Sequence, residues 1–457
     1  MSVRHSFLFL ALAAPLILSS TARAQSPWPL PVHDPVLASL IEEALSRSPD
    51  VAAARQAELA ARQRPIQARS LANPMVSVIY TNDGWSPSLG SMEDSNLALM
   101  VSQELPYPGK RGLRGDLASR EADQISQQVE RARRSIAAAI KRAYYGLLLS
   151  RGLLDLIRDQ EENWKQIEGV ARSRYAVGQG AQQDVLRVQV EVTRIQQSRA
   201  EQEAESEIRV AEINRLVARA PDTPVETPAQ LALRPVQGSI QQFLEWTAEV
   251  SPEVSVARLE AEKGSLAVSL AKKEFKPDFS AQSAYMNRRG LPPMWQAGIG
   301  VSVPLYRKKL RAGVAEAEAQ LSSTQSAIES IRLQLRFRTQ ERLTQLKTTE
   351  KVATLYGEGI LPQDRMSVEA ALANYQTGKV PFIAVLEALT TLYNDRATHL
   401  RLLANHEQTL ASLEEASLDP TSAMVSGAGG MAVGGSSLSM AGSAGGASAS
   451  GSGGMKQ

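Results

Sequence analysis

The 457-residue sequence contains no cysteine, which removes several kinds of chemistry at once. Disulfide bonds, thiolate metal sites, cysteine nucleophiles and lipidation of an N-terminal cysteine are all excluded. Histidine is scarce as well, and the pair His406-Glu407 does not begin a zinc-protease helix, because position 410 is Leu where a second histidine belongs. No phosphate-binding loop, nucleophile elbow or clustered acid–base group is evident. We therefore expect no enzyme activity, no cofactor and no metal site.

Neither basic nor acidic residues are in excess once the first 24 residues are set aside. These residues have the pattern of a secretory signal peptide, with Arg4 and His5 before an apolar run at 7–18 and a small-x-small site at 22–24. The run is too short to span the ~30 Å of a bilayer core, so a membrane anchor is the less favoured alternative. Removing Arg4 and Arg23 from the 50 basic residues leaves 48, against 48 acidic residues. This balance argues against a nucleic-acid partner.

Proline is absent from Lys110 to Ala220, which favours very long helices. Apolar residues recur at helical spacing over positions 110–177, a length of roughly 100 Å at 1.5 Å per residue. Ordinary helices average only ~11–12 residues. Tyr175-Ala176-Val177-Gly178-Gln179-Gly180 then predicts a corner, and a return helix follows over 181–219.

This corner has a second copy 200 positions later, at Tyr375-Gln376-Thr377-Gly378-Lys379, and other motifs repeat at an offset of 203. Such internal repetition fixes the architecture. We expect a signal peptide at 1–24, a first repeat at 25–220, a linker at 221–239, a second repeat at 240–416 and a disordered Gly/Ser/Met-rich tail at 417–457. Each repeat should run helix, strand hairpin (74–103 or 278–303), very long helix, corner (near 178 or 378) and helix. We also expect the first helix to run from Val36 to about Ser70, and the second long helix to break at Gly357-Glu358-Gly359 and Pro362.

The four predicted strands total 31 residues and contain no charged side chain: Pro74–Tyr80, Leu97–Gln103, Phe279–Met286 and Trp295–Val303. In the last strand, large apolar residues alternate with glycine, Gln and Ser. This pattern is typical of a transmembrane barrel wall with one lipid face and one polar face. Four strands cannot close a barrel, and open edges are not tolerated in lipid, so the strands predict an oligomer that shares one barrel. A small soluble sheet on a periplasmic coiled-coil scaffold remains the alternative.

The signal peptide, the duplicated order and the twin Tyr-x-x-Gly corners together resemble the TolC-type outer-membrane efflux family over residues 36–415. Gln103-Glu104-Leu105-Pro106-Tyr107-Pro108-Gly109-Lys110-Arg111 is similar to the family's heavy-metal branch, of the cobalt–zinc–cadmium or copper–silver kind. The resemblance implies a mainly α fold with a small β part. In it, a homotrimer forms a periplasmic α-barrel of long antiparallel helices and a twelve-stranded β-barrel in the outer membrane of a Gram-negative bacterium.

The resemblance also implies roles for the two corners. The adaptor-contact tips correspond to Val177, Gly178 and Gln179, and to Thr377, Gly378 and Lys379. Asp184 and Tyr375 match a pair that links neighbouring helices in the closed gate, and Glu387 matches one of two acidic ring positions. The other ring position is Ala384, and a basic gate residue of the family falls on Val380, so we expect a looser gate. Asp184 could also be only a dipole-stabilised acid of a first helical turn, and Glu387 only part of a solvated face.

These expectations define a passive exit duct of a tripartite efflux system, with metal ions as the expected substrate. Its partners would be a periplasmic adaptor protein and an inner-membrane pump of the resistance–nodulation–division (RND) type. Multidrug efflux and type I protein secretion use the same fold and remain alternatives.

Overall fold

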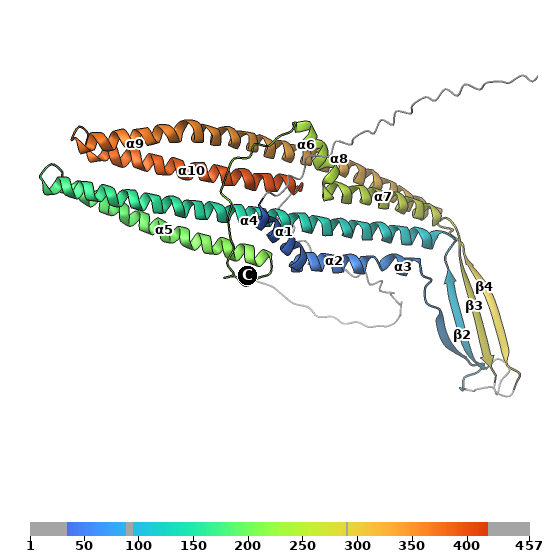
Figure 1. Cartoon of the computed structure of the whole chain (residues 1–457). Helices are drawn as coiled ribbons and strands as arrows, with labels where there is room; N and C mark the ends of the chain where they lie inside the picture. Colours follow the sequence, from blue (N-terminus) through green and yellow to red (C-terminus); the bar gives the residue numbers. More distant parts are fainter. Residues whose placement is uncertain (1–33, 88–94, 289–290, 419–457) are drawn as a thin grey trace, which may run out of the picture. The chain divides into compact units, whose positions relative to one another are not determined.

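The computed structural model describes residues 34–87, 95–288 and 291–418. The expected signal peptide, almost all of the expected tail and parts of two loops lie outside these ranges. Five long helices and five shorter ones carry most of the described chain, and Figure 1 shows their arrangement. The long helices are α4 (Lys110–Ala176), α5 (Gln182–Leu216), α7 (Pro252–Lys273), α8 (Arg307–Leu355) and α10 (Phe382–Glu414). Within the described ranges, no helix combines the length and the apolar character needed to cross a membrane.

The first helical segment is not continuous, contrary to the expectation of one helix from Val36 to Ser70. It consists of α1 (Pro35–Arg47), α2 (Pro49–Ala61) and α3 (Arg64–Arg69). Each of these helices has a proline at its first or second position. Proline fits the first turn of a helix but cannot accept the hydrogen-bonding pattern of an interior position, so each proline starts a new helix.

The second long helix is also different from its prediction, because it does not break at residues 357–362. Tyr356–Ile360 forms one turn of π-helix (η1) between α8 and α9 (Leu361–Gln376), and the chain remains helical throughout. Pro362 lies in the first turn of α9, where its missing N–H costs little. The π-turn accommodates the glycines and the proline by widening the helix rather than ending it.

The four strands form a single antiparallel sheet in sequence order (Figure 1). They are β1 (Met75–Thr81), β2 (Asn96–Leu105), β3 (Asp278–Asn287) and β4 (Met294–Ser302). The register sets Leu99 opposite Val78 and Tyr285, and Tyr285 opposite Trp295. Since paired residues share a face and successive residues alternate, one face collects large apolar side chains from all four strands. That face comprises Val76, Val78, Tyr80, Leu97, Leu99, Val101, Leu105, Phe279, Tyr285, Trp295, Ile299 and Val301, and every one of them is exposed.

Strands β2 and β3 extend beyond both of their predicted ends and so include two acidic residues, Glu104 and Asp278. Both lie at the end of the sheet that joins the helices and on the face opposite the apolar one. Asp278 accepts a hydrogen bond from the Tyr107 amide at 2.7 Å and pairs with Lys110 at 3.0 Å. Lys110 is buried and also contacts Glu274 at 3.0 Å. These charges therefore fasten the sheet to the helices and leave the apolar face uncharged.

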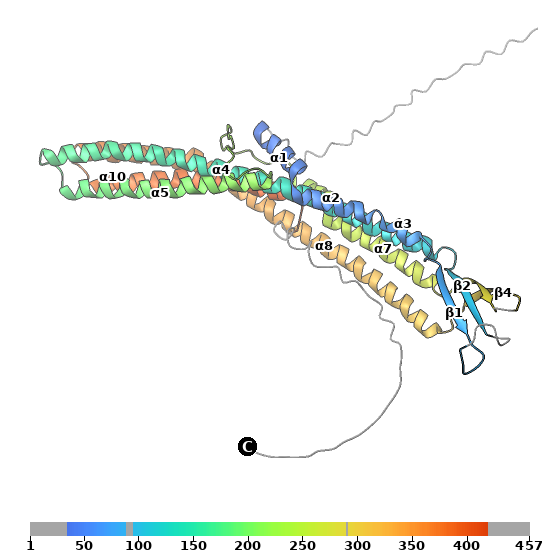
Figure 2. The same ribbon diagram turned by 90° about the horizontal axis from the view of Figure 1, so that it is seen from below.

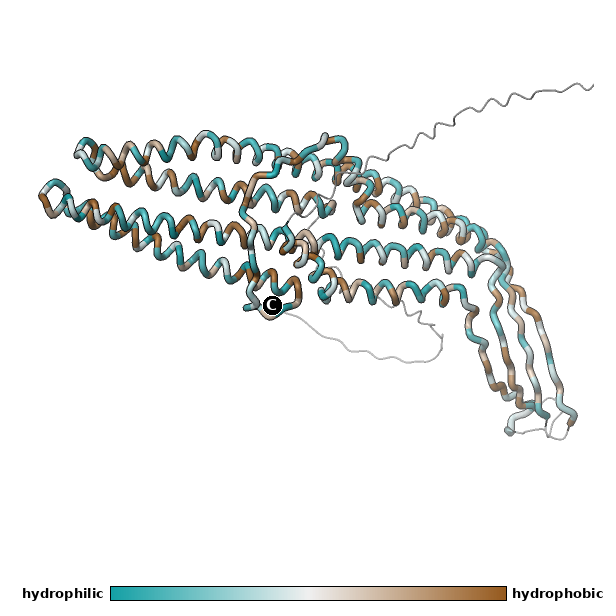
Figure 3. Tube along the Cα trace, in the orientation of Figure 1, coloured by the Kyte–Doolittle hydropathy of each residue, from teal (hydrophilic) through white to brown (hydrophobic). Residues whose placement is uncertain are grey.

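The helices that join the sheet follow the same order as its strands. In the contact pattern α3 packs on α4, α4 on α7 and α7 on α8, and these helices lead into or out of β1, β2, β3 and β4 respectively. Figures 1 and 2 show the four helix ends meeting the sheet at one end of the described chain. At the other end, α4 pairs with α5 and α9 pairs with α10. Hydrophobic and hydrophilic residues alternate along all these helices, and no long apolar run stands out (Figure 3).

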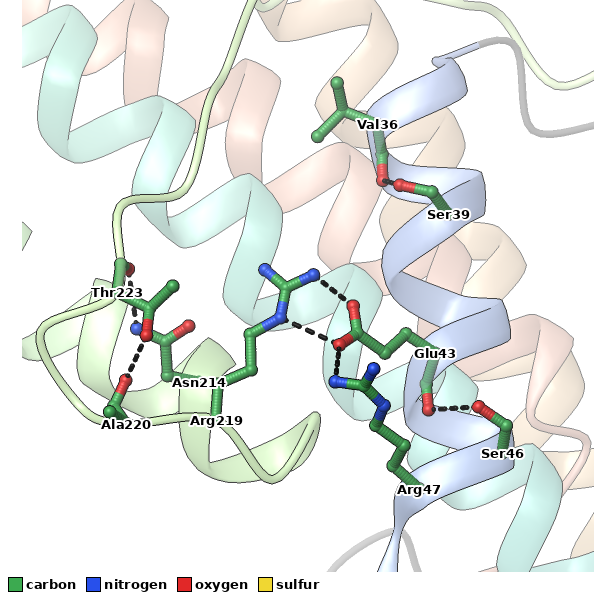
Figure 4. A network of polar contacts seen from close by, with 9 residues as sticks. All are labelled: Val36, Ser39, Glu43, Ser46, Arg47, Asn214, Arg219, Ala220 and Thr223. Atoms are coloured by element: carbon green, nitrogen blue, oxygen red, sulfur yellow. Dashed lines mark hydrogen bonds and ion pairs between the residues drawn. The ribbon is translucent and has the colours of Figure 1, made fainter.

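Polar contacts join α5 to the N-terminal helix where α5 ends (Figure 4). Arg219 donates to both carboxylate oxygens of Glu43 in α1, at 2.8 Å from Nε. The hydrogen bonds from Arg219 outweigh the effect of burial and lower the pKa of Glu43. Asn214 donates to the carbonyl oxygen of Thr223 at 2.7 Å and so fixes the start of the linker. Residues 221–238 contain no helix or strand.

Candidate functional site at the paired helix corners

The corner between α4 and α5 closes with two characteristic backbone hydrogen bonds. The Gly178 N–H donates to Tyr175 O at 3.0 Å, and the Gln179 N–H donates to Arg174 O at 2.8 Å. This is the Schellman arrangement, in which the residue after the cap adopts a left-handed conformation. Gly178 has φ +71°, which a glycine adopts without steric cost.

The corner between α9 and α10 repeats this geometry. The Gly378 N–H donates to Tyr375 O at 3.0 Å, the Lys379 N–H donates to Asn374 O at 2.9 Å, and Gly378 has φ +76°. The two glycines, 200 positions apart, therefore adopt the same left-handed backbone conformation and close their corners in the same way. The six expected tip residues are all exposed: Val177, Gly178, Gln179, Thr377, Gly378 and Lys379. Val177 leaves 67% of its surface accessible.

The two tyrosines of the corners differ in their environments, although they occupy equivalent positions. Tyr175 is 49% exposed, whereas Tyr375 is 3% exposed. Tyr375 packs edge-on against Phe382 with ring centroids 5.4 Å apart. Its hydroxyl donates to Asp184 Oδ2 in the first turn of α5, over a long 3.5 Å. The structure thus brings together Asp184 and Tyr375, which belong to different helix pairs.

Arg174 joins the two corners, and the sequence reasoning missed it. Its guanidinium lies 4.6 Å above the ring of Tyr375, a cation–π geometry, and donates to the Tyr375 carbonyl oxygen. It also donates to Gln179 O at 3.0 Å. The equivalent residue of the second corner is Asn374, so a search for shared residues passes over Arg174. The signal that could have found it is this difference between otherwise similar corners.

The electrostatics keep the Tyr375 hydroxyl protonated and able to donate. Burial and the nearby charge of Asp184 raise the pKa of Tyr375, and Arg174 opposes them only in part. Phenol ionisation already lies near pH 10 in water. Tyr375 therefore remains a neutral donor to Asp184 at any physiological pH.

Glu387, the third expected gate residue, is not part of this cluster. It is exposed on α10, and its side chain makes no hydrogen bond or ion pair with any part of the described chain. Val380, which replaces a basic residue of the family pattern, packs against the apolar core beneath the corners. That core joins both helix pairs, with Trp164, Val188, Phe382 and Val385 among its buried members. Among the residues described, no group of three or more histidine or acidic side chains is placed to hold a metal ion.

The long helix pairs end in matched corners, and at their other end they join a sheet with one exposed apolar face. This arrangement defines a channel of the outer-membrane efflux type. The chain belongs to the outer membrane efflux protein family, whose profile matches residues 40–219 and 245–417. The protein is an outer-membrane efflux channel. Its family consists of channels rather than enzymes.

Two curated relatives align with most of the chain. The cobalt-zinc-cadmium resistance protein CzcC of Cupriavidus metallidurans is 21% identical over 350 residues, covering 76% of this chain and 82% of CzcC. The nickel-cobalt-cadmium resistance protein NccC of Alcaligenes xylosoxydans xylosoxydans is 22% identical over 341 residues, covering 74% of this chain and 75% of NccC.

Solved structures share the fold at low sequence identity. The outer membrane protein VceC of Vibrio cholerae superposes with a TM-score of 0.68 at 19% identity, covering 83% of this chain and 94% of VceC. CusC, whose structures describe transmembrane channel formation, superposes with a TM-score of 0.69 at 15% identity, covering 84% of this chain and 92% of CusC. The predicted mainly α fold with four antiparallel strands and the predicted family are thereby confirmed.

Proposed function

We propose that three copies of this chain share one twelve-stranded barrel and stand on it as a periplasmic α-barrel. The observation that carries this proposal is the four-stranded sheet, whose apolar face is exposed across all strands. Strands β2, β3 and β4 have nine or ten residues each, which matches the thickness of a bilayer when they are tilted. The backbone groups at the free edges of β1 and β4 need partners in lipid, and further copies of the chain supply them. The twelve strands of three copies lie within the range of 8 to 26 and more that outer-membrane barrels use, and three is the number that the resemblance to the TolC-type family implies.

We further propose that the paired corners form the periplasmic mouth, which the Arg174–Tyr375–Asp184 cluster holds closed. The cluster ties the α9–α10 corner to the α4–α5 pair, and opening a pore between the pairs requires these contacts to break. Glu387 would add a ring of three carboxylates around the axis, which concentrates cations. The exposed tips at 177–179 and 377–379 would meet a periplasmic adaptor protein, and through it an inner-membrane pump of the RND type.

Metal-ion efflux is the function that these features support best. CzcC and NccC are named for resistance to divalent metal ions, and each aligns with about three quarters of the chain. The channel would conduct ions passively, because catalysis and energy coupling belong to the pump. Multidrug efflux or protein export through the same duct is the alternative, and neither requires a change in the fold.

Metal tolerance tests this function. A Gram-negative host that lacks the gene should become sensitive to cobalt, zinc or cadmium salts, and the wild-type gene should restore growth. The matched comparison is tolerance to hydrophobic antibiotics and dyes in the same strains. Sensitivity to these compounds with unchanged metal tolerance would assign the duct to multidrug efflux. Secretion of a large protein that is lost with the gene would assign it to protein export.

A further inference from the structure

Four exposed basic residues cluster where β4 leads into α8. Arg307, Lys308, Lys309 and Arg311 lie within the first five residues of the helix, which has no acidic residue in its first turn. None of the four makes an ion pair or a side-chain hydrogen bond with another described residue. The cluster therefore carries four positive charges that nothing in the described part of the chain compensates.

Several other basic residues at the same end of the helices are engaged. Arg69 pairs with Asp116 at 2.8 Å, Lys272 pairs with Glu318 at 3.0 Å, and Lys110 is buried between two carboxylates. The start of α8 differs from these positions because its side chains are left facing solvent. A structural role in fastening the sheet to the helices does not account for it.

The position of the cluster is also unfavourable for the helix itself. The N-terminus of a helix carries a partial positive charge, so cations in its first turn are repelled and acidic residues are preferred there. The Arg307–Arg311 segment places four cations where α8 alone would favour carboxylates. An external negative charge would remove this conflict.

The residues just before the cluster are exposed and suited to a membrane interface. Leu305 and Tyr306 leave 77% and 81% of their surfaces accessible, although both are large and mainly apolar. Two residues separate them from the end of β4, whose apolar face includes Trp295 and Ile299. Tyrosine is enriched where hydrocarbon meets headgroups, and basic side chains beyond it reach the headgroups. The order along the chain is thus apolar strand, interfacial tyrosine and then cations.

We propose that residues 305–311 form a docking surface for anionic phospholipid headgroups of the periplasmic leaflet, with the phosphate bound by Arg307, Lys308, Lys309 and Arg311. The inference rests on the proposed function in one respect, since it needs the sheet to span the membrane. Clusters of four or more basic residues beside a membrane segment bind anionic lipid, and each charge raises binding about fivefold. The surface would hold the start of each α8 helix at a fixed depth below the bilayer.

The test compares two variants of the full-length oligomer that lose the same number of positive charges at different places. In the first, Lys308→Gln, Lys309→Gln and Arg311→Gln remove three of the four charges of the cluster. In the control, Lys347→Gln, Lys351→Gln and Arg336→Gln neutralise three exposed residues farther along α8, none of which is ion-paired within the described chain. Native mass spectrometry in neutral detergent then counts the bound lipid during titration with phosphatidylglycerol or phosphatidylcholine of equal chain length.

The wild type and the control should retain phosphatidylglycerol over phosphatidylcholine, and the cluster variant should bind phosphatidylglycerol at least tenfold more weakly. Equal loss in both variants, or no loss in the cluster variant, overturns the proposal. If the triple variant fails to assemble, the three single variants decide, since unchanged binding in all three overturns it as well. Wild-type protein that inserts and conducts but binds both lipids equally contradicts only this inference, whereas failure to insert contradicts the proposed function.

Discussion

At the scale of single residues, Arg174 determines how the two corners meet. Its guanidinium contacts the ring and carbonyl oxygen of Tyr375 and the carbonyl oxygen of Gln179. It replaces the Asn found at the equivalent place in the other corner, so the twin corners are alike in backbone but not in side-chain contacts. The asymmetry gives the first corner a side chain that contacts the second corner, and the second corner has no equivalent arginine.

Removing this link should open the mouth. We expect Arg174→Gln, Asp184→Ala and Tyr375→Phe each to raise the single-channel conductance in planar bilayers severalfold over a low wild-type value, because each removes a contact between the helix pairs. Arg172→Gln is the matched control, since Arg172 lies two residues away and pairs only with Glu168 of its own helix at 2.7 Å. Unchanged conductance in all three tip variants would remove the gate assignment.

His406 should make the stability of the helical region depend on pH, and the direction of its pKa shift fixes the sign of that dependence. Burial disfavours its charged form, but contacts with Glu407 and with Glu350, the latter at 3.1 Å, outweigh this and raise the pKa of His406 above 6.5. A raised folded-state pKa adds stability that is fully present below pH 6.5 and is lost as pH rises through the folded-state value. The difference in free energy of unfolding between wild type and His406→Gln should therefore shrink as pH rises from 6 to 8.

His399 serves as a control, because its contribution to stability should change with pH in the opposite direction. Burial lowers the pKa of His399, so its neutral form is favoured in the folded protein. The advantage of wild type over His399→Gln should grow as pH rises through 6.5. Denaturant titrations of both variants at several pH values measure the two slopes, and slopes of the same sign for the two histidines would contradict this reading.

At the scale of elements, periodicity and proline placement predicted most of the fold. The 67-residue length of α4 and the positions of both corners follow from helical spacing and from glycine, and the structure agrees. The errors came from residues with two possible effects. Pro49 starts a new helix, but Pro362 does not end one, because the π-turn at 356–360 absorbs the irregularity. The proline alone does not decide between these outcomes, because Pro49 and Pro362 both lie in the first turn of a helix and only Pro49 follows an interruption of the helix.

The candidate site, like the fold, could be predicted from the sequence only in part. Asp184 and Tyr375 were proposed from a family resemblance, and the structure brings them into contact. Arg174 was missed because its interaction depends on how two segments 200 residues apart are placed. The run of basic residues at the start of α8 can be read from the sequence, but the sequence does not show whether their charges are exposed or paired.

The two faces of the sheet should respond differently to charge. Ile299 is 82% exposed on the apolar face, and an arginine there should oppose membrane insertion by about 2–4 kcal/mol. Gln296 lies on the opposite face of the same strand, so Gln296→Arg adds the same side chain on the side of the pore. We expect Ile299→Arg to lower the amount of protein in the outer-membrane fraction severalfold and Gln296→Arg to leave it nearly unchanged. Equal effects would show that the two faces do not differ in environment.

At the scale of the whole molecule, the sheet is incomplete as it stands in one chain. β1 and β4 each have one neighbour, and two strands separate them. With strands about 4.8 Å apart, the edges of one chain are roughly 14 Å from each other, beyond the reach of a disulfide. Any disulfide between β1 and β4 must therefore join two copies of the chain.

Cysteine crosslinking between these edges tests the central claim most directly, and the absence of native cysteine makes it unambiguous. Val78→Cys in β1 is combined in turn with Trp295→Cys, Ala297→Cys, Ile299→Cys or Val301→Cys in β4, which all share its face. After oxidation in outer membranes, a shared twelve-stranded barrel predicts dimers and covalent trimers, but no larger species, for at least one pair on a denaturing gel. Monomers alone for every pair, or a ladder that continues beyond three, would contradict it.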